Sequence, residues 1–341
     1  MKVSDFSYEL PEDLIAQHPP AKRGTSRLLI LNRKTGELQH RNYSDMSEYL
    51  NPGDVLVLND TKVIKARLIA MNQRGQTREL LLLEDHHNTD FTCRKALYRG
   101  RLRQDELLKV NGAQIRVEEI HDGGIALISS LTNLLDLAEK NGTVPLPPYM
   151  HRDATQADTE RYQTVFARQP GSVAAPTASL NFTSELERTL KNKGIELAYL
   201  TLHVGLGTFL PIRSDDIEGH EMHSEYFEIP EKTAQTIKAA KDRGKRVVAV
   251  GTTVTRTLEF THQQLLADVS ADISGEADIF IYPGYDFKII DSMLTNFHAP
   301  KSTVLMMAAA FAGWDNLEHA YQEALREKYA FLSYGDSMLI L

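Results

Sequence analysis

Residues 246–260 read RVVAVGTTVTRTLEF, and this stretch decides the fold. The run at 246–250 is rich in valine and has the composition of a buried strand. Gly251 follows, and the threonines after it can cap a helix. The stretch therefore predicts a strand, a tight loop and a helix, which is the repeating unit of an α/β protein with parallel strands.

The same alternation continues on both sides of this stretch. Further strands are expected at 27–32, 54–60, 195–204 and 277–282. Helices are expected to begin at Ser184 (a capping box with Glu187), Pro230 and Ser302, and to end near Gly194, Gly244 and Gly313. We therefore predict an α/β body whose sheet is mostly parallel or barrel-like.

Residues 63–130 have a different pattern. Six short apolar runs follow one another, separated by turn sequences such as QRG, NG and DGG. Such spacing is typical of a small antiparallel barrel or sandwich. The proline-rich segment VPLPPYMHR at 144–152 then forms a stiff crossing. We predict an inserted β-barrel domain at 63–150, and a discontinuous α/β catalytic domain made of 1–62 and 151–341.

Composition limits the class of protein. The chain has 341 residues, a formal net charge of −8 and one cysteine, Cys93, so an intrachain disulfide is excluded. No segment has the length or composition of a membrane span or a signal peptide. The expectation is a soluble, cytoplasmic, monomeric protein. Charge is uneven, because residues 62–116 hold twelve Lys and Arg against six acids. Such a basic module can dock a polyanion, although a solvated charged sheet face is the simpler interpretation.

Ligands of open α/β sheets bind where strands end and loops begin. Three such places carry polar residues. His203, Gly205 and Gly207 follow one strand, although a lone G-x-G is also an ordinary turn. Thr252 and Arg256 follow another, where capping alone is an equal alternative. The third is the long segment 282–303, with Tyr282, Tyr285, Asp291, Asn296, His298 and Lys301.

Two more polar clusters are candidates. Residues 218–230 hold His223 and Glu225, but their spacing fits no standard zinc motif, so we expect acid–base or hydrogen-bonding roles and no metal. Asp60 and Lys62 directly follow a strand. Residues 171–182, GSVAAPTASLNF, carry no charge and many small side chains, so they form either a linker or the wall of a binding site.

Nine motifs in order span nearly the whole chain. They are LNDTKVIKARL, VPLPPYMHR, ERYQTVFA, PGSVAAPTA, LTLHVGLGTFLPI, MHSEYFEI, VGTTVTRTLE, IYPGYDFKIIDSMLTNFHAPKST and YAFLSYGDSML. Together they resemble the S-adenosylmethionine:tRNA ribosyltransferase-isomerase family of queuosine biosynthesis.

The resemblance implies an activity and a fold. Members transfer and isomerise the ribosyl part of S-adenosylmethionine onto 7-aminomethyl-7-deazaguanine at the wobble position of tRNA. The product is epoxyqueuosine, and adenine and methionine are released. S-adenosylmethionine is a consumed co-substrate, and no cofactor or metal is implied. The family fold is likewise an α/β body with an inserted small β-barrel. The implied partners are the tRNA anticodon stem-loop and S-adenosylmethionine.

This chemistry needs a base, an acid for the departing adenine and exclusion of water. The catalytic candidates are His203, His223, His298, Asp60, Glu225 and Asp291. The substrate-binding candidates are Ser172, Thr177, Asn181, Gly205, Gly207, Thr252, Arg256, Tyr282, Tyr285 and Asn296. The tRNA-binding candidates are Lys62, Arg94, Lys95, Arg99, Arg101 and Arg103.

The resemblance also marks a departure. Relatives commonly carry Gly and His where this chain has Ser179 and Asn181, and asparagine cannot transfer protons as histidine does.

Two other functions are considered for the chain. An S-adenosylmethionine-dependent RNA methyltransferase would be expected to carry an early glycine-rich loop, which the sequence lacks. A non-catalytic RNA-binding protein would explain the basic module but not the histidines at strand ends.

Overall fold

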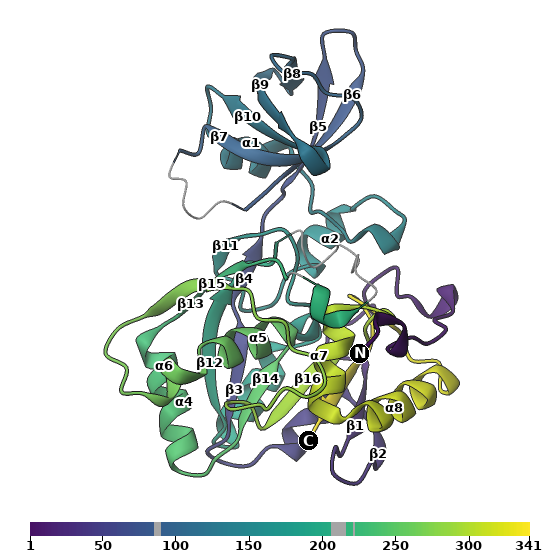
Figure 1. Cartoon of the computed structure of the whole chain (residues 1–341), viewed down its shortest axis with the longest axis vertical. Coiled ribbons are helices and arrows are strands. Elements are labelled where there is room, and N and C mark those ends of the chain that lie inside the picture. Colours follow the sequence, from purple (N-terminus) through teal and green to yellow (C-terminus); the bar gives the residue numbers. More distant parts are fainter. Residues whose placement is uncertain (85–89, 206–215, 221) are drawn as a thin grey trace.

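The computed structural model describes residues 1–84, 90–205, 216–220 and 222–341. Figure 1 shows two parts: a small barrel at one end, and a larger body of sheet and helices joined to it by a narrow neck. Gly207 lies outside the described residues.

The body is built on a nine-stranded sheet with the order β15-β13-β12-β3-β14-β16-β17-β1-β2. These strands are β1 (Arg27–Leu31), β2 (Leu38–Asn42), β3 (Val55–Asn59), β12 (Glu196–Leu202), β13 (Glu225–Ile229), β14 (Val247–Val250), β15 (Ile273–Ala277), β16 (Ser292–Asn296) and β17 (Ser337–Ile340). The central four, β12, β3, β14 and β16, run parallel. Every residue of β3 and β14 is buried, as expected of strands covered on both faces.

The sheet is mixed rather than mostly parallel, because β17, β2, β13 and β15 each form an antiparallel pair. The expected strand at 277–282 is wrong. β15 ends at Ala277, and the apolar residues after it pack as irregular chain.

Helices cover both faces of this sheet. Alternate residues of β3 separate two apolar clusters, with Val55 and Val57 in one and Leu56 and Leu58 in the other. The helices of the body are α2 (Gln156–Arg161), α3 (Ser184–Asn192), α4 (Glu231–Asp242), α5 (Thr252–Phe260), α6 (His262–Leu266), α7 (Thr303–Ala312) and α8 (Trp314–Arg326). Short 3₁₀ helices are η1 (Val3–Asp5), η2 (Glu12–Leu14), η3 (Tyr43–Tyr49), η5 (Pro148–Met150), η6 (Thr177–Ser179) and η8 (Ile217–Gly219).

Capping explains where the helices begin and end. The Ser302 hydroxyl accepts from the Leu305 N–H at the start of α7, and Gly313 ends α7 at φ 81°, both as the sequence predicts. The cap of α3 is Thr183 rather than Ser184, because the Thr183 hydroxyl accepts from the Leu186 N–H.

The inserted module is a closed antiparallel barrel of six strands, as the sequence predicts. Its strands are β5 (Arg67–Asn72), β6 (Thr77–Leu82), β7 (Cys93–Arg99), β8 (Leu107–Val110), β9 (Ala113–His121) and β10 (Ile125–Ser130), with the turn η4 (Asp122–Gly124) and the helix α1 (Leu134–Asn141). All of them fall within 63–150, and α1 contributes Leu134, Leu137 and Ala138 to the barrel core.

The neck between the two parts contains a two-stranded parallel ribbon. β4 (Thr61–Val63) pairs with β11 (Gln169–Ser172), so the chain leaving the body lies beside the chain that has returned to it. This ribbon brings the stretch 171–182 to the carboxyl ends of β3 and β12, where the site described next is found.

Candidate functional site

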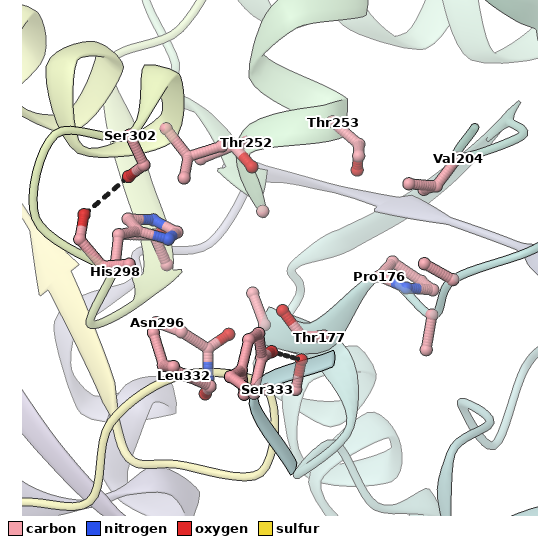
Figure 2. Close-up of a pocket in the computed structure, with 18 of the residues that line it drawn as sticks. Pro176, Thr177, Val204, Thr252, Thr253, Asn296, His298, Ser302, Leu332 and Ser333 are labelled. Atoms are coloured by element: carbon pink, nitrogen blue, oxygen red, sulfur yellow. Dashed lines mark hydrogen bonds between the residues drawn. The ribbon is translucent and has the colours of Figure 1, made fainter. Parts of the chain in front are cut away.

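A cavity of about 150 Å³ lies at the carboxyl ends of the parallel strands. Its walls come from segments far apart in sequence: residues 174–178, the start of α5, the end of β16 and the start of α7. Tyr149, Tyr162, Leu332 and Ser333 complete the lining. Figure 2 shows labelled side chains from each of these segments, such as Thr177, Thr252 and Asn296, around a common space. The stretch 171–182 is therefore a wall rather than a linker.

Small side chains keep this wall close to the sheet. The Ser172 hydroxyl donates to the Ala174 carbonyl, 2.6 Å away, and accepts from the Val204 N–H at 2.9 Å. Gly171 packs against the ring of His203, and a Cβ at position 171 would lie 2.8 Å from that ring. The ring is fixed further by Thr61 Oγ1, 2.7 Å from His203 Nδ1.

His298 is the imidazole in the lining of the cavity. Its Nε2 lies 2.7 Å from Thr295 Oγ1, and its backbone is held by Tyr8 and Tyr321. Figure 2 shows the ring directed into the cavity. Burial lowers the pKa of His298 to about 4, so the ring is neutral near pH 7. Its Nδ1 makes no hydrogen bond with any described residue, so it can serve as a proton acceptor in the tautomer that carries its proton on Nε2.

Two helix N-termini point partial positive charge at the cavity. α5 begins with Thr252 and Thr253, and α7 begins just after Ser302, and all three residues line the space. None of the described lining residues carries a formal charge at neutral pH, since His298 is neutral. An anionic group of a ligand would therefore be stabilised by helix dipoles and free N–H groups.

Asn296 offers an acceptor in the same wall. Its Nδ2 donates to the carbonyls of Leu332 and Asp336. Its Oδ1 is buried and finds no partner among the described residues. A buried acceptor without a partner costs stability unless a ligand or water donates to it, so it indicates a binding contact.

A smaller cavity, about 40 Å³, lies on the other side of Thr252, Thr253 and Val304. His223, Glu225 and Arg256 line it. Arg256 donates from Nη1 to Glu225 Oε2 at 2.9 Å and from Nη2 to the carbonyls of His223 and Ala277. Both terminal nitrogens are thus already used within the protein.

Known proteins are similar to this chain over nearly its whole length. Residues 3–340 match the family model described as queuosine biosynthesis protein. The chain belongs to this queuosine biosynthesis family. A relative from Chlorobaculum parvum, named S-adenosylmethionine:tRNA ribosyltransferase-isomerase, is 57% identical, with 100% of each chain covered. A relative of the same name from Pelodictyon phaeoclathratiforme is 54% identical, also with 100% of each covered.

A solved structure is similar as well. The crystal structure of S-adenosylmethionine tRNA ribosyltransferase from Thermotoga maritima is 36% identical, with a TM-score of 0.58, and covers 99% of this chain and 100% of its own. Among the described residues, no helix is long and apolar enough to cross a membrane. Within the same residues, no group of three or more His, Cys, Asp and Glu could hold a metal ion.

The structure brings together only part of the candidate set taken from the family resemblance. Thr177, Thr252, Asn296 and His298 line the main cavity. His223, Glu225 and Arg256 line the smaller one. Ser172, His203 and Gly205 lie behind the walls, where Gly205 N–H donates to Glu225. Asp60 is buried and accepts from the Thr201 hydroxyl at 2.7 Å; burial raises its pKa, and it lines neither cavity.

Three candidates lie away from both cavities. Asp291 is at the opposite edge of the sheet, where its carboxylate accepts from Lys241 and from the Val247 N–H at the start of β14. Tyr285 donates to the buried carboxylate of Glu259, which also accepts three N–H groups of residues 288–290. Tyr282 lines neither cavity and packs on Phe280. These three side chains therefore stabilise the segment 282–303 and do not line either cavity.

Several lining residues were not predicted as site residues. Thr295 sits beside His298, and Tyr149, Tyr162 and Ser333 form the opposite wall. The Tyr149 and Ser333 hydroxyls are hydrogen-bonded, and burial raises the pKa of Tyr149 to about 12, so its hydroxyl stays protonated at neutral pH. Tyr149, Tyr162 and Ser333 lie in the motifs VPLPPYMHR, ERYQTVFA and YAFLSYGDSML, so those motifs were the available signal.

Asn181 is buried but does not line the cavity. Its Nδ2 donates to the Gly335 carbonyl at 3.3 Å, and Ser179 is likewise buried outside the lining. We expect Asn181→His to change the rate of adenine release less than threefold, because position 181 lies outside the site. Steady-state kinetics of the purified variant check this, with the melting temperature as the control for folding. A gain of tenfold or more would instead mean that a proton-transferring histidine is missing here.

Proposed function

We propose that this chain transfers and isomerises the ribosyl moiety of S-adenosylmethionine onto 7-aminomethyl-7-deazaguanine at the tRNA wobble position. The product is epoxyqueuosine-tRNA, with release of adenine and methionine. The observation that carries the proposal is the 57% identity, over full length, to a relative named for this activity. The cavity supports it, because it combines a neutral base with two helix N-termini in one site.

The roles follow from the contacts. His298 is the proposed base that removes a proton from the 5′ carbon beside the sulfonium, since its ring is neutral and its Nδ1 is available. The N-termini of α5 and α7 are the proposed site of the methionine carboxylate. Asn296 Oδ1 is the proposed acceptor for a ribose hydroxyl or the adenine amino group. Arg256 positions Glu225 and β13 and does not clamp the carboxylate.

The positions of the other two candidate histidines assign them to roles other than that of the base. His203 is buried behind the wall, where it is stacked on Tyr226 and held by Thr61, so we assign it to positioning the 171–174 segment. His223 belongs to the smaller cavity, beside the Glu225–Arg256 pair. A cytoplasmic location, a monomeric state and the anticodon stem-loop as the RNA element stay predictions that accompany this proposal.

The experiment that tests the function follows both products. Purified enzyme is incubated with S-adenosylmethionine and tRNA carrying 7-aminomethyl-7-deazaguanine, and free adenine and the modified nucleoside are measured by mass spectrometry. We expect adenine release only with the deazaguanine-bearing tRNA, in equal amount to epoxyqueuosine. A methylated nucleoside with S-adenosylhomocysteine would establish a methyltransferase instead, and RNA binding without turnover would establish a binding protein. If His203→Ala and His298→Ala both keep near-normal turnover, histidine does not perform the proton transfer.

A further inference from the structure

A third hollow lies on the barrel, remote from the two cavities in the body. It has a volume of about 560 Å³ and is formed between the β5–β6 hairpin and the segment that leads into β8. The β5–β6 hairpin lies at the end of the barrel that points away from the body (Figure 1). We call this hollow the barrel groove.

The lining of the barrel groove is almost entirely polar. Eleven of the described residues line it: four arginines, four residues with side-chain amides, two with carboxylates and one leucine. Sites for small organic ligands are mostly apolar. Surfaces that bind nucleic acid are polar and positively charged, and arginine, asparagine and glutamine are side chains that contact phosphate and sugar. The composition therefore fits an RNA backbone rather than a small molecule.

The two carboxylates of the groove are already occupied. Glu106 accepts from Asn72 Nδ2 at 2.9 Å and from the Arg103 N–H at 3.0 Å. Asp105 is paired with Arg116. The exposed guanidinium groups of Arg74, Arg101 and Arg103 form no ion pair with any described residue. Among the described residues, Arg78 donates to neutral oxygens of Thr77 and Gln76 and forms no ion pair, so its charge is not neutralised by them.

The distribution of charge along the chain also favours the barrel as the surface that binds RNA. Residues 62–116 carry a net charge of +6, whereas the rest of the chain carries −14. A polyanion that places one nucleotide in the acidic body needs positive charge elsewhere for its other phosphates. Arg94, a tRNA candidate from the sequence, cannot supply it, because it is buried and donates to the Leu83 carbonyl. Lys62, Lys95, Arg99, Arg101 and Arg103 are exposed, but only the last two line the groove.

We propose that the barrel groove binds backbone phosphates of the tRNA stem outside the modified loop, through Arg74, Arg78, Arg101 and Arg103. This inference rests on the proposed function for the identity of the RNA. The groove is not the set of tRNA-binding residues predicted from the sequence. It includes Arg74 and Arg78, which that set lacks, and it excludes Arg94, which that set contains. The rival surface is the exposed outer face of β7, with Lys95 and Arg99.

The test compares three double charge reversals with the wild-type protein. The groove variant is Arg74→Glu with Arg101→Glu, and the β7 variant is Lys95→Glu with Arg99→Glu. The matched control is Lys140→Glu with Lys232→Glu, because it has the same change in net charge, at exposed positions on α1 and α4 outside the groove. Equilibrium binding of full-length tRNA is measured by filter retention between about 50 and 200 mM salt, the range where phosphate contacts dominate.

We expect the groove variant to bind tRNA at least about tenfold more weakly at 100 mM salt, and its slope of log K against log[salt] to be shallower by about 2. The control should bind within about threefold of wild type. A groove variant that keeps the wild-type affinity and slope overturns the proposal. A loss confined to the β7 variant also overturns it and places the RNA on β7.

The binding result is separated from the proposed function by turnover. At saturating tRNA, we expect the groove variant to release adenine at the wild-type kcat, with a raised KM for tRNA and an unchanged KM for S-adenosylmethionine. Normal kcat with normal tRNA binding would overturn the groove and leave the function intact. Absence of adenine release by the wild-type protein would overturn the function, whereas the salt dependence would still report on the groove.

Discussion

Replacing His298 by alanine is expected to lower kcat for adenine release by about 10²–10⁴-fold, the usual contribution of a positioned general base. The reason is that His298 is the imidazole in the main cavity, held there by Thr295 and by the clamps on its backbone. The measurement is steady-state adenine release at saturating S-adenosylmethionine and tRNA. His319→Ala is the matched control, because His319 is exposed on α8 and should leave kcat within about twofold of wild type.

The pH dependence of wild-type kcat gives an independent check of this assignment. Burial lowers the pKa of His298 to about 4, so the neutral base persists well below the ordinary histidine pKa of about 6.5. We expect no loss of kcat attributable to His298 between about pH 8 and pH 5. Because the folded-state pKa is depressed, His298 also destabilises the fold as pH falls from 6.5 towards 4. An acidic limb of kcat near pH 6.5 that disappears in His298→Ala would contradict the depressed pKa.

Removing the partner of His298 separates positioning from proton transfer. Thr295→Val keeps the shape of the side chain but removes the hydroxyl next to Nε2. We expect kcat to fall by about tenfold with little change in KM, because the ring loses its orientation but keeps its basic nitrogen. Retention of at least one third of wild-type kcat by His298→Ala would remove His298 from the chemistry.

The sequence predicted the architecture well, because periodicity reports on burial. The six barrel strands alternate inward and outward residues between clear turns, and β3 and β14 are continuous apolar runs. The failed strand at 277–282 shows the limit of this signal. Ile279, Phe280 and Ile281 are apolar because they line the smaller cavity, and a short apolar run does not distinguish a strand from such a segment.

The site was predicted only in part. A position next to a strand in the sequence does not say at which edge of the sheet a side chain lies, or whether it lines the cavity or is buried behind it. His298, Asn296 and Thr252 follow strands at the correct edge and line the cavity. Asp291 lies only a few residues away from them but precedes β16, so it falls at the opposite edge. Tyr149 and Ser333 are separated by 184 residues and meet only in the fold, which no local pattern reports.

Asp158→Ala is expected to cause the largest loss of stability. Asp158 is buried and accepts a bidentate pair from Arg152 at 2.7 and 2.8 Å, together with the Tyr334 hydroxyl at 2.8 Å. Its loss removes the carboxylate partner of the partly buried Arg152 guanidinium and leaves the buried Tyr334 hydroxyl without this acceptor, which together costs about 3–5 kcal/mol. We expect the melting temperature to fall by about 4–7 °C, measured by calorimetry at pH 7.

The same substitution should disturb the cavity, because Asp158 connects two of its walls. Tyr334 donates to the Asp158 carboxylate, follows the lining residues Leu332 and Ser333, and packs edge-on against the lining residue Tyr162. We therefore expect KM for S-adenosylmethionine to rise in Asp158→Ala at a temperature where the protein stays folded. Asp242→Ala is the matched control: its pair with Lys238 is exposed and screened by solvent, so its loss should leave the melting temperature and KM close to those of wild type.

Acid titration distinguishes the ionised pair from a packing effect. Burial alone would raise the pKa of Asp158, but the hydrogen bonds from Arg152, Thr155 and Tyr334 outweigh it and hold the pKa well below its usual value. The pair therefore contributes its full stabilisation above about pH 4, and this stabilisation declines as pH falls towards the depressed folded-state pKa. The difference in unfolding free energy between wild type and Asp158→Ala should narrow from pH 5 to pH 2. A difference that stays constant over this range would mean that the carboxylate acts by packing alone, and Asp158→Asn, which keeps the volume, would then match the wild-type stability.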